Sequence, residues 1–264
     1  MVCSDNERDG VTGDGEEDGE ERLPGGHVGG AVRVGDTVRR PVGPWTPAVH
    51  ALLAHLAPRL PGVPRVLGFD ARGREVLSYL PGTVVDHRTE SLTLVRLASF
   101  VAWTRAFHTA VAGFAHPGPW RYPPLPGPTL IGHNDLAPWN ACFEGDALTG
   151  VFDWDLSGPS TPLDELAFVA WTCVPLWHDI GADAAAQRLA TIADAYGDGA
   201  LTPRRILRAV PARLRAMFDG LPVGAAAGDP GLAHLVTPNW RERSLATLAK
   251  LVTRMPAIDR LLDG

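Results

Sequence analysis

The segment from His133 to Asn140, with a further acid at Asp153, constrains this chain more than any other part of its sequence. Its pattern is His-x-Asp-x-x-x-x-Asn, in which the acid is Asp135. Transfer of a phosphoryl group from a magnesium nucleotide requires a carboxylate that orients the acceptor hydroxyl and oxygen ligands for the metal. The segment provides both kinds of side chain, so it predicts a phosphoryl-transfer site with Asp135 as the base or orienting group.

The local sequence predicts how these side chains meet. The apolar runs 141–143 and 148–152 flank Glu144-Gly145-Asp146, a pattern typical of a β-hairpin with a glycine-containing turn. Asn140 precedes the first strand and Asp153 follows the second, so antiparallel pairing brings both to the open end of the hairpin. An amide and a carboxylate there suit magnesium, which takes one or two protein ligands and completes its shell with water and phosphate oxygens.

Three neighbouring residues need separate interpretation. Pro138 is expected to keep the loop that carries Asp135 from becoming a helix. His133 is expected to support that loop by hydrogen bonding to backbone rather than to act in the chemistry. Asp155 either assists the metal, lies near the acceptor, or is a solvated loop acid.

These residues resemble the catalytic and metal-binding core of the aminoglycoside phosphotransferase and choline kinase-like superfamily, relatives of the protein kinases. The resemblance implies that Asp135 is the catalytic base, that Asn140 and Asp153 hold Mg²⁺, and that ATP is the phosphoryl donor. It extends to residues 162–167, which are similar to the family's Asp-Leu-Ala segment and make Asp164 a structural support of the site. Asp164 is also a good N-cap for the apolar residues that follow it.

The fold class implied is α+β: a bilobal protein-kinase-like fold with a small β-rich N-terminal lobe and a larger, mainly helical C-terminal lobe. We expect a disordered acidic tail over residues 1–23, a reduced nucleotide-binding lobe over 24–82, and a catalytic and acceptor-binding lobe over 83–264. A chain of 264 residues can bury a core as one large domain or as two lobes. Two lobes that close on a cleft agree better with the resemblance.

The predicted small lobe begins with a glycine-rich stretch ahead of a hairpin over residues 32–40. Gly26 and Gly29 would let backbone N–H groups approach phosphate oxygens, although a flexible linker has the same composition. The resemblance makes Arg40 the phosphate-holding residue where kinases place a Lys, with Arg39 as the alternative. Arginine and lysine are not equivalent at this position, because a guanidinium binds phosphate as a planar fork whereas an ammonium acts as a point charge.

A second hairpin is predicted from strands over 66–69 and 75–80. In the family such a strand leads to the hinge between the lobes, so the resemblance places the nucleotide base near Ser78 and Leu80. A plain core strand would have the same pattern.

The helix predicted between these hairpins departs from the family. Thr46 is its expected N-cap and Pro47 its first residue. Kinases carry on this helix a Glu that pairs with the phosphate-binding Lys, but no acid occurs from Thr46 through Ala57. His50 and His55 are expected to be surface or partly buried positions rather than replacements, so the missing pair counts against catalytic competence.

Helical patterns dominate the second half of the chain, and these helices are expected to build the acceptor pocket. They are predicted over residues 91–110, 165–178, 182–197, 203–219 and 240–253. Four acids among them either meet a cationic acceptor or form a solvated face: Asp179, Asp183, Asp194 and Asp198.

The charge balance limits the classes of partner. Residues 1–23 carry nine acidic and two basic side chains, a net −7, so a chain of net −6 leaves the remainder near +1. That remainder has no basic field for nucleic acid. Three cysteines without close spacing indicate a reducing compartment, and no apolar stretch suits a signal peptide or a membrane span. We therefore expect a cytoplasmic protein.

Three functions compete at this point. The favoured one is an ATP- and Mg²⁺-dependent phosphotransferase acting on a small-molecule hydroxyl, with the acceptor unspecified. The second is a non-catalytic kinase-like nucleotide-binding module, which the absent helix Glu makes plausible. The third and weakest is a metal-dependent hydrolase that uses His133, Asp135 and Asp153.

Overall fold

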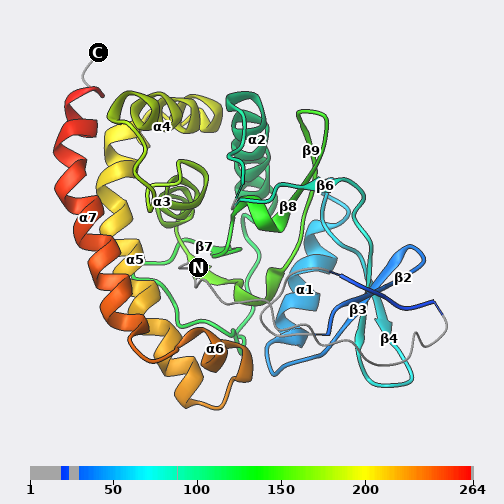
Figure 1. Ribbon diagram of the computed structural model, residues 1–264. Helices are drawn as coiled ribbons and strands as arrows, with labels where there is room; N and C mark the ends of the chain where they lie inside the picture. Colours follow the sequence, from blue (N-terminus) through cyan, green and yellow to red (C-terminus); the bar gives the residue numbers. More distant parts are fainter. Residues whose placement is uncertain (1–18, 24–29, 88, 263–264) are drawn as a thin grey trace.

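The computed structural model describes residues 19–23, 30–87 and 89–262 and has two lobes (Figure 1). The smaller lobe contains a five-stranded antiparallel sheet, and the larger lobe is mainly helical with two short sheets. The fold is thus the α+β, two-lobed architecture that the sequence predicts. The strands of the larger sheet are, in spatial order, β1 Glu21–Arg22, β2 Val32–Val34, β3 Thr37–Arg40, β5 Glu75–Ser78 and β4 Val66–Phe69.

Both predicted hairpins of the smaller lobe are confirmed. β2 and β3 pair around Gly35, whose φ of +58° is a left-handed conformation that glycine adopts without steric cost. β4 pairs with β5, which ends at Ser78, two residues earlier than predicted. These hairpins place β3 beside β5 in the middle of the sheet.

The acidic tail departs from its prediction at its end. We expected disorder through residue 23, but β1 pairs with β2. Beside it, Glu20 forms an ion pair with Arg74 at 2.6 Å. A free strand edge and a cation therefore order residues 19–23, which the composition of the tail alone did not indicate.

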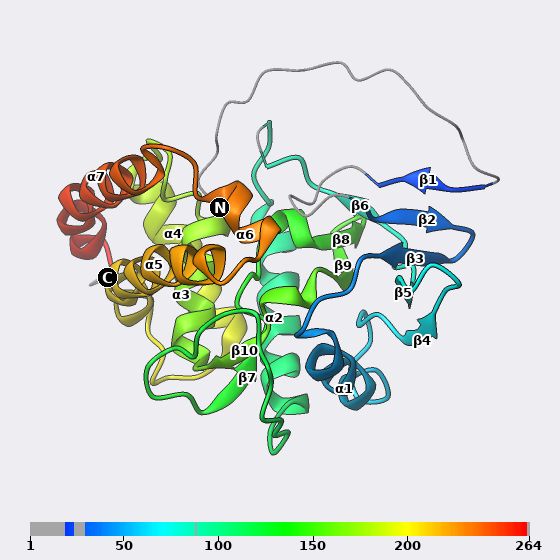
Figure 2. The same ribbon diagram turned by 90° about the horizontal axis from the view of Figure 1, so that it is seen from below.

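The helix α1, Thr46–Leu56, packs beside the sheet (Figures 1 and 2). It buries the residues expected from the helical period: Val49, Leu52, Leu53 and Leu56. The N-cap is Trp45 rather than Thr46. The Thr46 hydroxyl instead accepts a hydrogen bond from the Gly43 backbone N–H at 2.9 Å.

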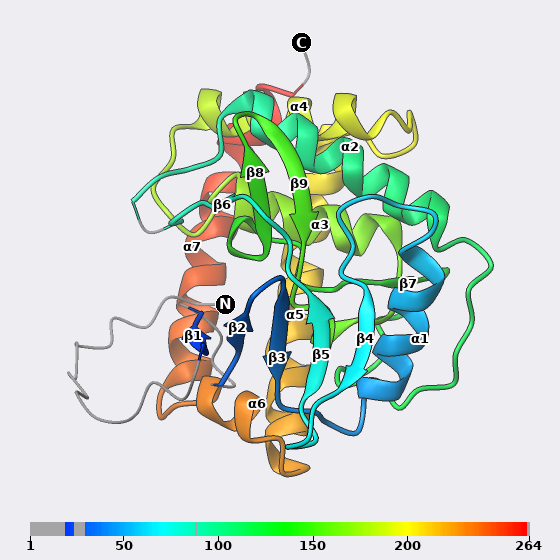
Figure 3. The ribbon, with the colours of Figure 1, turned by 90° about the vertical axis from the view of Figure 1, so that its right-hand side faces the viewer.

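The larger lobe contains the hairpin that the site requires (Figure 3). β8, Ala141–Glu144, pairs antiparallel with β9, Ala147–Val151, and β6, Thr83–Val84, adds a third strand. The second sheet pairs β7, Leu130–Gly132, with β10, Gly158–Ser160. Two 3-10 turns follow β7 and β9: η1, Pro138–Asn140, and η2, Trp154–Leu156.

The helices of the larger lobe pack around α3 and α5, and α5 runs beside α7 (Figure 1). Their bounds are α2 Leu94–Ala110, α3 Pro162–Cys173, α4 Ala182–Tyr196, α5 Pro203–Ala226, α6 Pro230–Leu235 and α7 Trp240–Arg260. No helix within the described ranges is both long and apolar enough to cross a bilayer.

The helix α5 is the largest departure from the predicted elements. The sequence predicts that this helix ends at residue 219, before Gly220, but the helix continues to Ala226. A Cβ at Gly220 would lie 2.6 Å from the hydroxyl of Tyr122, so this glycine permits close packing of an aromatic ring instead of ending the helix. The short helix α6 was not predicted, and α7 extends past residue 253.

Candidate active site

The loop between β7 and β8 carries Asp135, which is half-buried. Asn140 Nδ2 donates hydrogen bonds to Asp135 Oδ2 at 2.8 Å and to the Asp135 carbonyl at 2.9 Å. Since the amide nitrogen of Asn140 contacts Asp135, the amide oxygen is the atom suited to a metal. Pro138 begins the turn η1, so the loop contains a turn of 3-10 helix that we did not predict.

Asp153 and Asn140 lie at the open end of the β8–β9 hairpin, where the sequence placed them. Ala141 pairs with Val151, and the Phe152 N–H donates to the Asn140 carbonyl at 2.9 Å. Asp153 follows directly in a left-handed conformation, with φ +62°, and its side chain is 42% exposed. A non-glycine residue held in this region is a common feature of functional sites, and this one presents a carboxylate that solvent can reach.

Arg40, at the end of β3, lies at the centre of the site. Its Nη1 is 3.2 Å from Asp153 Oδ1, and its Nη2 is 2.5 Å from Asp155 Oδ1. Its Nε lies 2.6 Å from Oε1 of Glu75, the residue opposite it on β5. Arg39 points to the other face of the sheet because side chains alternate along a strand. Arg40 is therefore held by three carboxylates, one from its own sheet and two from the segment after β9.

The acidic partner that α1 lacks comes from the sheet. Glu75 is 2% exposed, and its Oε2 lies 2.6 Å from Nε2 of His50 on α1. Burial alone would raise the pKa of Glu75, but the hydrogen bond from His50 and the charge of Arg40 outweigh it and lower the pKa. His50 is partly buried, as expected, and it connects the helix to the Arg40–Glu75 pair. His55 instead contacts the Ala110 carbonyl, at 2.9 Å.

Asp155 is not a solvated loop acid, because its side chain is 13% exposed and lies between two arginines. Besides Arg40, it contacts Arg121 Nη1 at 3.3 Å. Arg121 also binds Asp229 through Nε at 2.6 Å and Nη2 at 2.8 Å, and its guanidinium stacks 4.3 Å from the ring centroid of Trp45. Asp155 thus links Arg40 of the small lobe to Arg121 of the large lobe. Sequence spacing did not indicate that Arg121 and Asp229 belong to this cluster.

Charges in the site favour binding of a further cation. Burial raises the pKa of Asp135 to about 7, and the negative charge of Asp153 acts in the same direction. Burial also raises the pKa of Asp155, with Asp153 again opposing ionisation, despite the charges of Arg40 and Arg121. A divalent ion beside Asp153 would remove this repulsion and favour the ionised carboxylates.

Asn140 and Asp153 fit magnesium by their chemistry. Both offer hard oxygen atoms, and magnesium needs few protein ligands when a nucleotide supplies phosphate oxygens. Among the described residues, no three His, Cys, Asp or Glu side chains converge as a metal-binding cluster.

Glu165, rather than Asp164, contacts the loop that carries Asp135. Glu165 is fully buried, and its two oxygens accept the backbone N–H groups of His133 at 2.9 Å and Asn134 at 2.7 Å. Asp164 accepts a hydrogen bond from the hydroxyl of Thr161, the actual N-cap of α3, at 2.6 Å. The prediction of Asp164 as the N-cap was wrong. Since Glu165 directly precedes Leu166-Ala167, a close look at the Asp-Leu-Ala resemblance could have indicated it.

His133 contacts backbone through both ring nitrogens. Its Nε2 lies 3.1 Å from the Phe152 carbonyl, and its Nδ1 accepts from the Asp135 N–H at 3.3 Å. Burial lowers its pKa, and its ring packs against Trp154 at 4.6 Å between centroids. This neutral, enclosed ring connects the loop to the end of β9.

The remaining nucleotide-binding candidates are placed only in part. Gly26 and Gly29 lie outside the described residues. The hydroxyl of Ser78 accepts from the Arg65 N–H at 2.8 Å, and Leu80 packs against Gly150, where a Cβ would approach it to 2.7 Å. The Leu80 contact places the segment after β5 against the β8–β9 hairpin, whereas the Ser78 contact joins β5 to the residue before β4.

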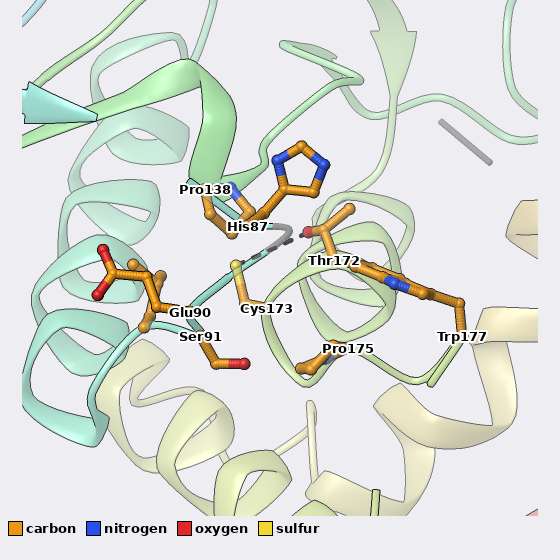
Figure 4. A pocket seen from close by; sticks show the side chains of 9 residues that line it. His87, Glu90, Ser91, Pro138, Thr172, Cys173, Pro175 and Trp177 are labelled. Carbon is orange, nitrogen blue, oxygen red and sulfur yellow. Dashed lines mark hydrogen bonds between the residues drawn. The ribbon is translucent and has the colours of Figure 1, made fainter. Parts of the chain in front are cut away.

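A small cavity borders Pro138, at the start of the turn η1 (Figure 4). Its walls come from the segment before α2, from Pro138, and from the end of α3 with the residues after it. The lining residues are His87, Glu90, Ser91, Leu92, Pro138, Thr172, Cys173, Pro175 and Trp177. The Trp139 ring lies 4.7 Å from that of His87 and 6.3 Å from that of Trp177, so aromatic rings flank the turn.

The four acids considered for a cationic acceptor do not gather around Asp135. Asp179, Asp183 and Asp194 are exposed, and Asp198 lies 3.9 Å from Arg105. Asp183 and Asp194 lie on α4, Asp179 precedes this helix and Asp198 follows it.

The fold and the site together define the class of protein. A small lobe with a β-sheet packs beside a helical lobe, and the carboxylate of Asp135 lies next to Asn140 and Asp153 at the open end of the β8–β9 hairpin. This is the architecture of a kinase-like phosphotransferase. The model of the phosphotransferase enzyme family matches residues 120–216. A trifolitoxin immunity protein from Rhizobium leguminosarum bv. trifolii is 34% identical over 207 residues, which cover 75% of this chain and 72% of that protein. The chain belongs to the phosphotransferase enzyme family.

Solved structures share the fold at lower identity. An aminoglycoside 2'-phosphotransferase-IIIa, in its GDP complex, is 16% identical with a TM-score of 0.58, covering 89% of this chain and 93% of that one. A choline/ethanolamine kinase family protein from Mesorhizobium loti is 19% identical with a TM-score of 0.57, covering 92% and 91%. A macrolide 2'-phosphotransferase from Brachybacterium faecium is 20% identical with a TM-score of 0.52, covering 83% and 87%.

Proposed function

We propose that this protein transfers the γ-phosphate of ATP to a hydroxyl group of a small molecule, with Mg²⁺ as cofactor, in the cytoplasm. The observation that carries the proposal is the placement of Asp135 beside Asn140, at the mouth where Asp153 emerges and Arg40 reaches across from the small lobe. This is a base, a pair of metal ligands and a phosphate-binding cation within one site.

The chain's own residues have separable tasks in this reaction. The Asp135 carboxylate accepts the proton of the acceptor hydroxyl as its oxygen forms a bond to the γ-phosphorus, while the bond to the β–γ bridging oxygen breaks. Arg40 orients the phosphates. Mg²⁺ held by Asn140 and Asp153 would neutralise charge on the phosphate oxygens. Burial of Glu75 beneath Arg40 fixes the guanidinium, so the phosphate-binding group is positioned before the nucleotide arrives.

A non-catalytic nucleotide-binding module is the alternative. Its main support was the lack of an acid on α1, and Glu75 with His50 supplies that acid from another element. The retention of Asp135, Asn140 and Asp153 in one arrangement favours catalysis.

The acceptor is proposed as a hydroxyl-bearing antibiotic or toxin. Support comes from the name of the immunity protein and from the aminoglycoside and macrolide phosphotransferases among the structural neighbours. The aromatic rings of Trp139 and Trp177 beside the turn η1 would suit an acceptor with apolar surface.

A screen of acceptors tests the proposal. Nucleoside diphosphate release would be measured with ATP or GTP, with and without Mg²⁺, against aminoglycosides, macrolides, choline-like alcohols, sugars and toxin peptides that carry Ser or Thr. Asp153→Ala serves as the matched blank. We expect at least one acceptor to stimulate Mg²⁺-dependent release in the wild type alone. Binding of Mg²⁺-nucleotide without stimulated release by any acceptor would favour the non-catalytic alternative.

A further inference from the structure

Arg213, on α5, is a buried arginine. It is 2% exposed, and among the described residues it forms no direct ion pair; its longer-range charge interaction is with Asp135. Its Nε and Nη1 are buried and form no hydrogen bond within 3.5 Å to any described residue, while the Tyr122 hydroxyl lies close enough to interact with the guanidinium. The ring of Phe168 lies 4.8 Å from the guanidinium carbon. A buried charge that no acidic side chain contacts directly costs stability, so its presence beside the site requires an explanation.

The hydrogen bond that Arg213 does form is to the residue before the proposed base. Its Nη2 donates to the Asn134 carbonyl at 2.8 Å. Asn134 has a left-handed φ of +64°, and the peptide group whose carbonyl Arg213 holds is the one that joins it to Asp135. The orientation of this peptide determines where the Asp135 side chain points.

Asn134 is held from two sides by opposite charges. Glu165, on α3, accepts its N–H at 2.7 Å, while Arg213 binds its carbonyl from α5. Its side-chain Nδ2 donates to the carbonyls of Leu156 at 3.1 Å and Gly158 at 3.3 Å. Hydrogen bonds to charged groups are stronger than those between neutral groups, so these two can hold a backbone conformation that a non-glycine residue disfavours.

We propose that Arg213 is a positioning residue: it fixes the Asn134–Asp135 peptide and thereby aims the Asp135 carboxylate at the acceptor hydroxyl. The proposal rests on the function proposed above. Displacement of a reacting group by about 1 Å can lower a rate by roughly 10²-fold. Arg213 therefore affects the chemical step, while the nucleotide contacts of Arg40 and Asp153 are unchanged.

The test compares Arg213→Met with Arg188→Met. Arg188, on α4, serves as the control because it is a half-buried arginine that donates to backbone carbonyls, those of Cys173 and Leu92, and to none of residues 133–135. We expect Arg213→Met to lower kcat by about 10- to 100-fold with a nucleotide KM within about threefold of wild type. Arg213→Lys, which keeps the charge and one donor, should recover part of the loss. Arg188→Met should leave kcat unchanged even where it lowers Tm.

Amide hydrogen exchange of residues 133–135 provides a readout that does not need an acceptor. Arg213→Met should accelerate exchange there, and Arg188→Met should not. Unchanged kcat and unchanged exchange in Arg213→Met would overturn the inference, as would equal effects of the two variants. If Arg213→Met does not fold, Arg213→Gln, which removes the charge and shortens the side chain, takes its place, and wild-type kcat and exchange in that variant also overturn the inference. A wild type that is inactive with every acceptor, but whose loop exchange responds to Arg213 alone, would refute the proposed function and leave the positioning role standing.

Discussion

Arg40 and Glu75 face each other on adjacent strands, with Nε and Oε1 2.6 Å apart and the carboxylate 2% exposed. Kinases obtain the acid for this pair from a helix, whereas here a neighbouring strand supplies it and the helix contributes His50. The cation that reaches Asp153 and Asp155 is thus held from the small lobe by a buried counter-ion.

Replacement of Arg40 should weaken nucleotide binding. Arg40→Met removes the cation that reaches toward Asp153, and it leaves Glu75 with His50 as its remaining partner. We expect the Kd for Mg²⁺-ATP to rise at least tenfold and stability to fall by about 3–5 kcal/mol, as when one member of a buried pair is removed. Calorimetric titration and chemical denaturation measure the two. Arg39→Met, on the opposite face of the same strand, is the control, and equal effects of the two variants would contradict the assignment.

Glu75→Gln tests whether the strand acid replaces the missing helix acid. The amide keeps the shape but removes the charge that orients Arg40 and binds His50. We expect kcat/KM for the nucleotide to fall about tenfold and stability to fall by about 1–3 kcal/mol. Glu144→Gln, at an exposed hairpin position, should change neither. Wild-type kinetics in Glu75→Gln would show that Arg40 needs no partner.

Single substitutions of the two adjacent acids of α3 distinguish their roles. Glu165→Gln replaces a carboxylate that accepts two backbone N–H groups with an amide that has one acceptor oxygen, so we expect kcat to fall by at least tenfold with lower stability. Asp164→Asn alters only the contact with Thr161 and should cost about 1 kcal/mol or less. Activity assays and Tm measurements distinguish them. A larger loss of kcat in Asp164→Asn than in Glu165→Gln would favour the prediction from sequence that Asp164 supports the site.

The sequence predicted the hairpins and the meeting of Asn140 with Asp153, because these depend on local turns and on the geometry of antiparallel pairing. It did not predict Arg121, Asp229 or Arg213, since each reaches the site from a distant segment through tertiary packing. Gly220 was misjudged for a similar reason, because its role depends on the ring of Tyr122 rather than on its own helix.

Asp135 should make stability depend on pH. Its pKa in the folded protein is about 7, above the ordinary value of 3.8, so between these values the folded state binds more protons than the unfolded state. Stability therefore falls as pH rises from about 4 to 7. Asp135→Asn has no carboxylate to ionise, so it lacks this pH-dependent penalty. Without Mg²⁺, its stability advantage over wild type should therefore increase from pH 5 to pH 8, on the order of a few kcal/mol.

Denaturation at the two pH values checks this dependence. The exposed Asp146→Asn should show the same difference from wild type at both. A stability gap between Asp135→Asn and wild type that does not change with pH would contradict the raised pKa.

The most direct test is the rate of phosphorylated product formation by wild type and Asp135→Asn, measured at saturating Mg²⁺-ATP with an acceptor from the screen. Loss of a positioned base should lower this rate by roughly 10²–10⁴-fold while the calorimetric Kd for Mg²⁺-ATP stays nearly unchanged. Equal rates in the two proteins would contradict the role of Asp135 and with it the proposed phosphotransferase site.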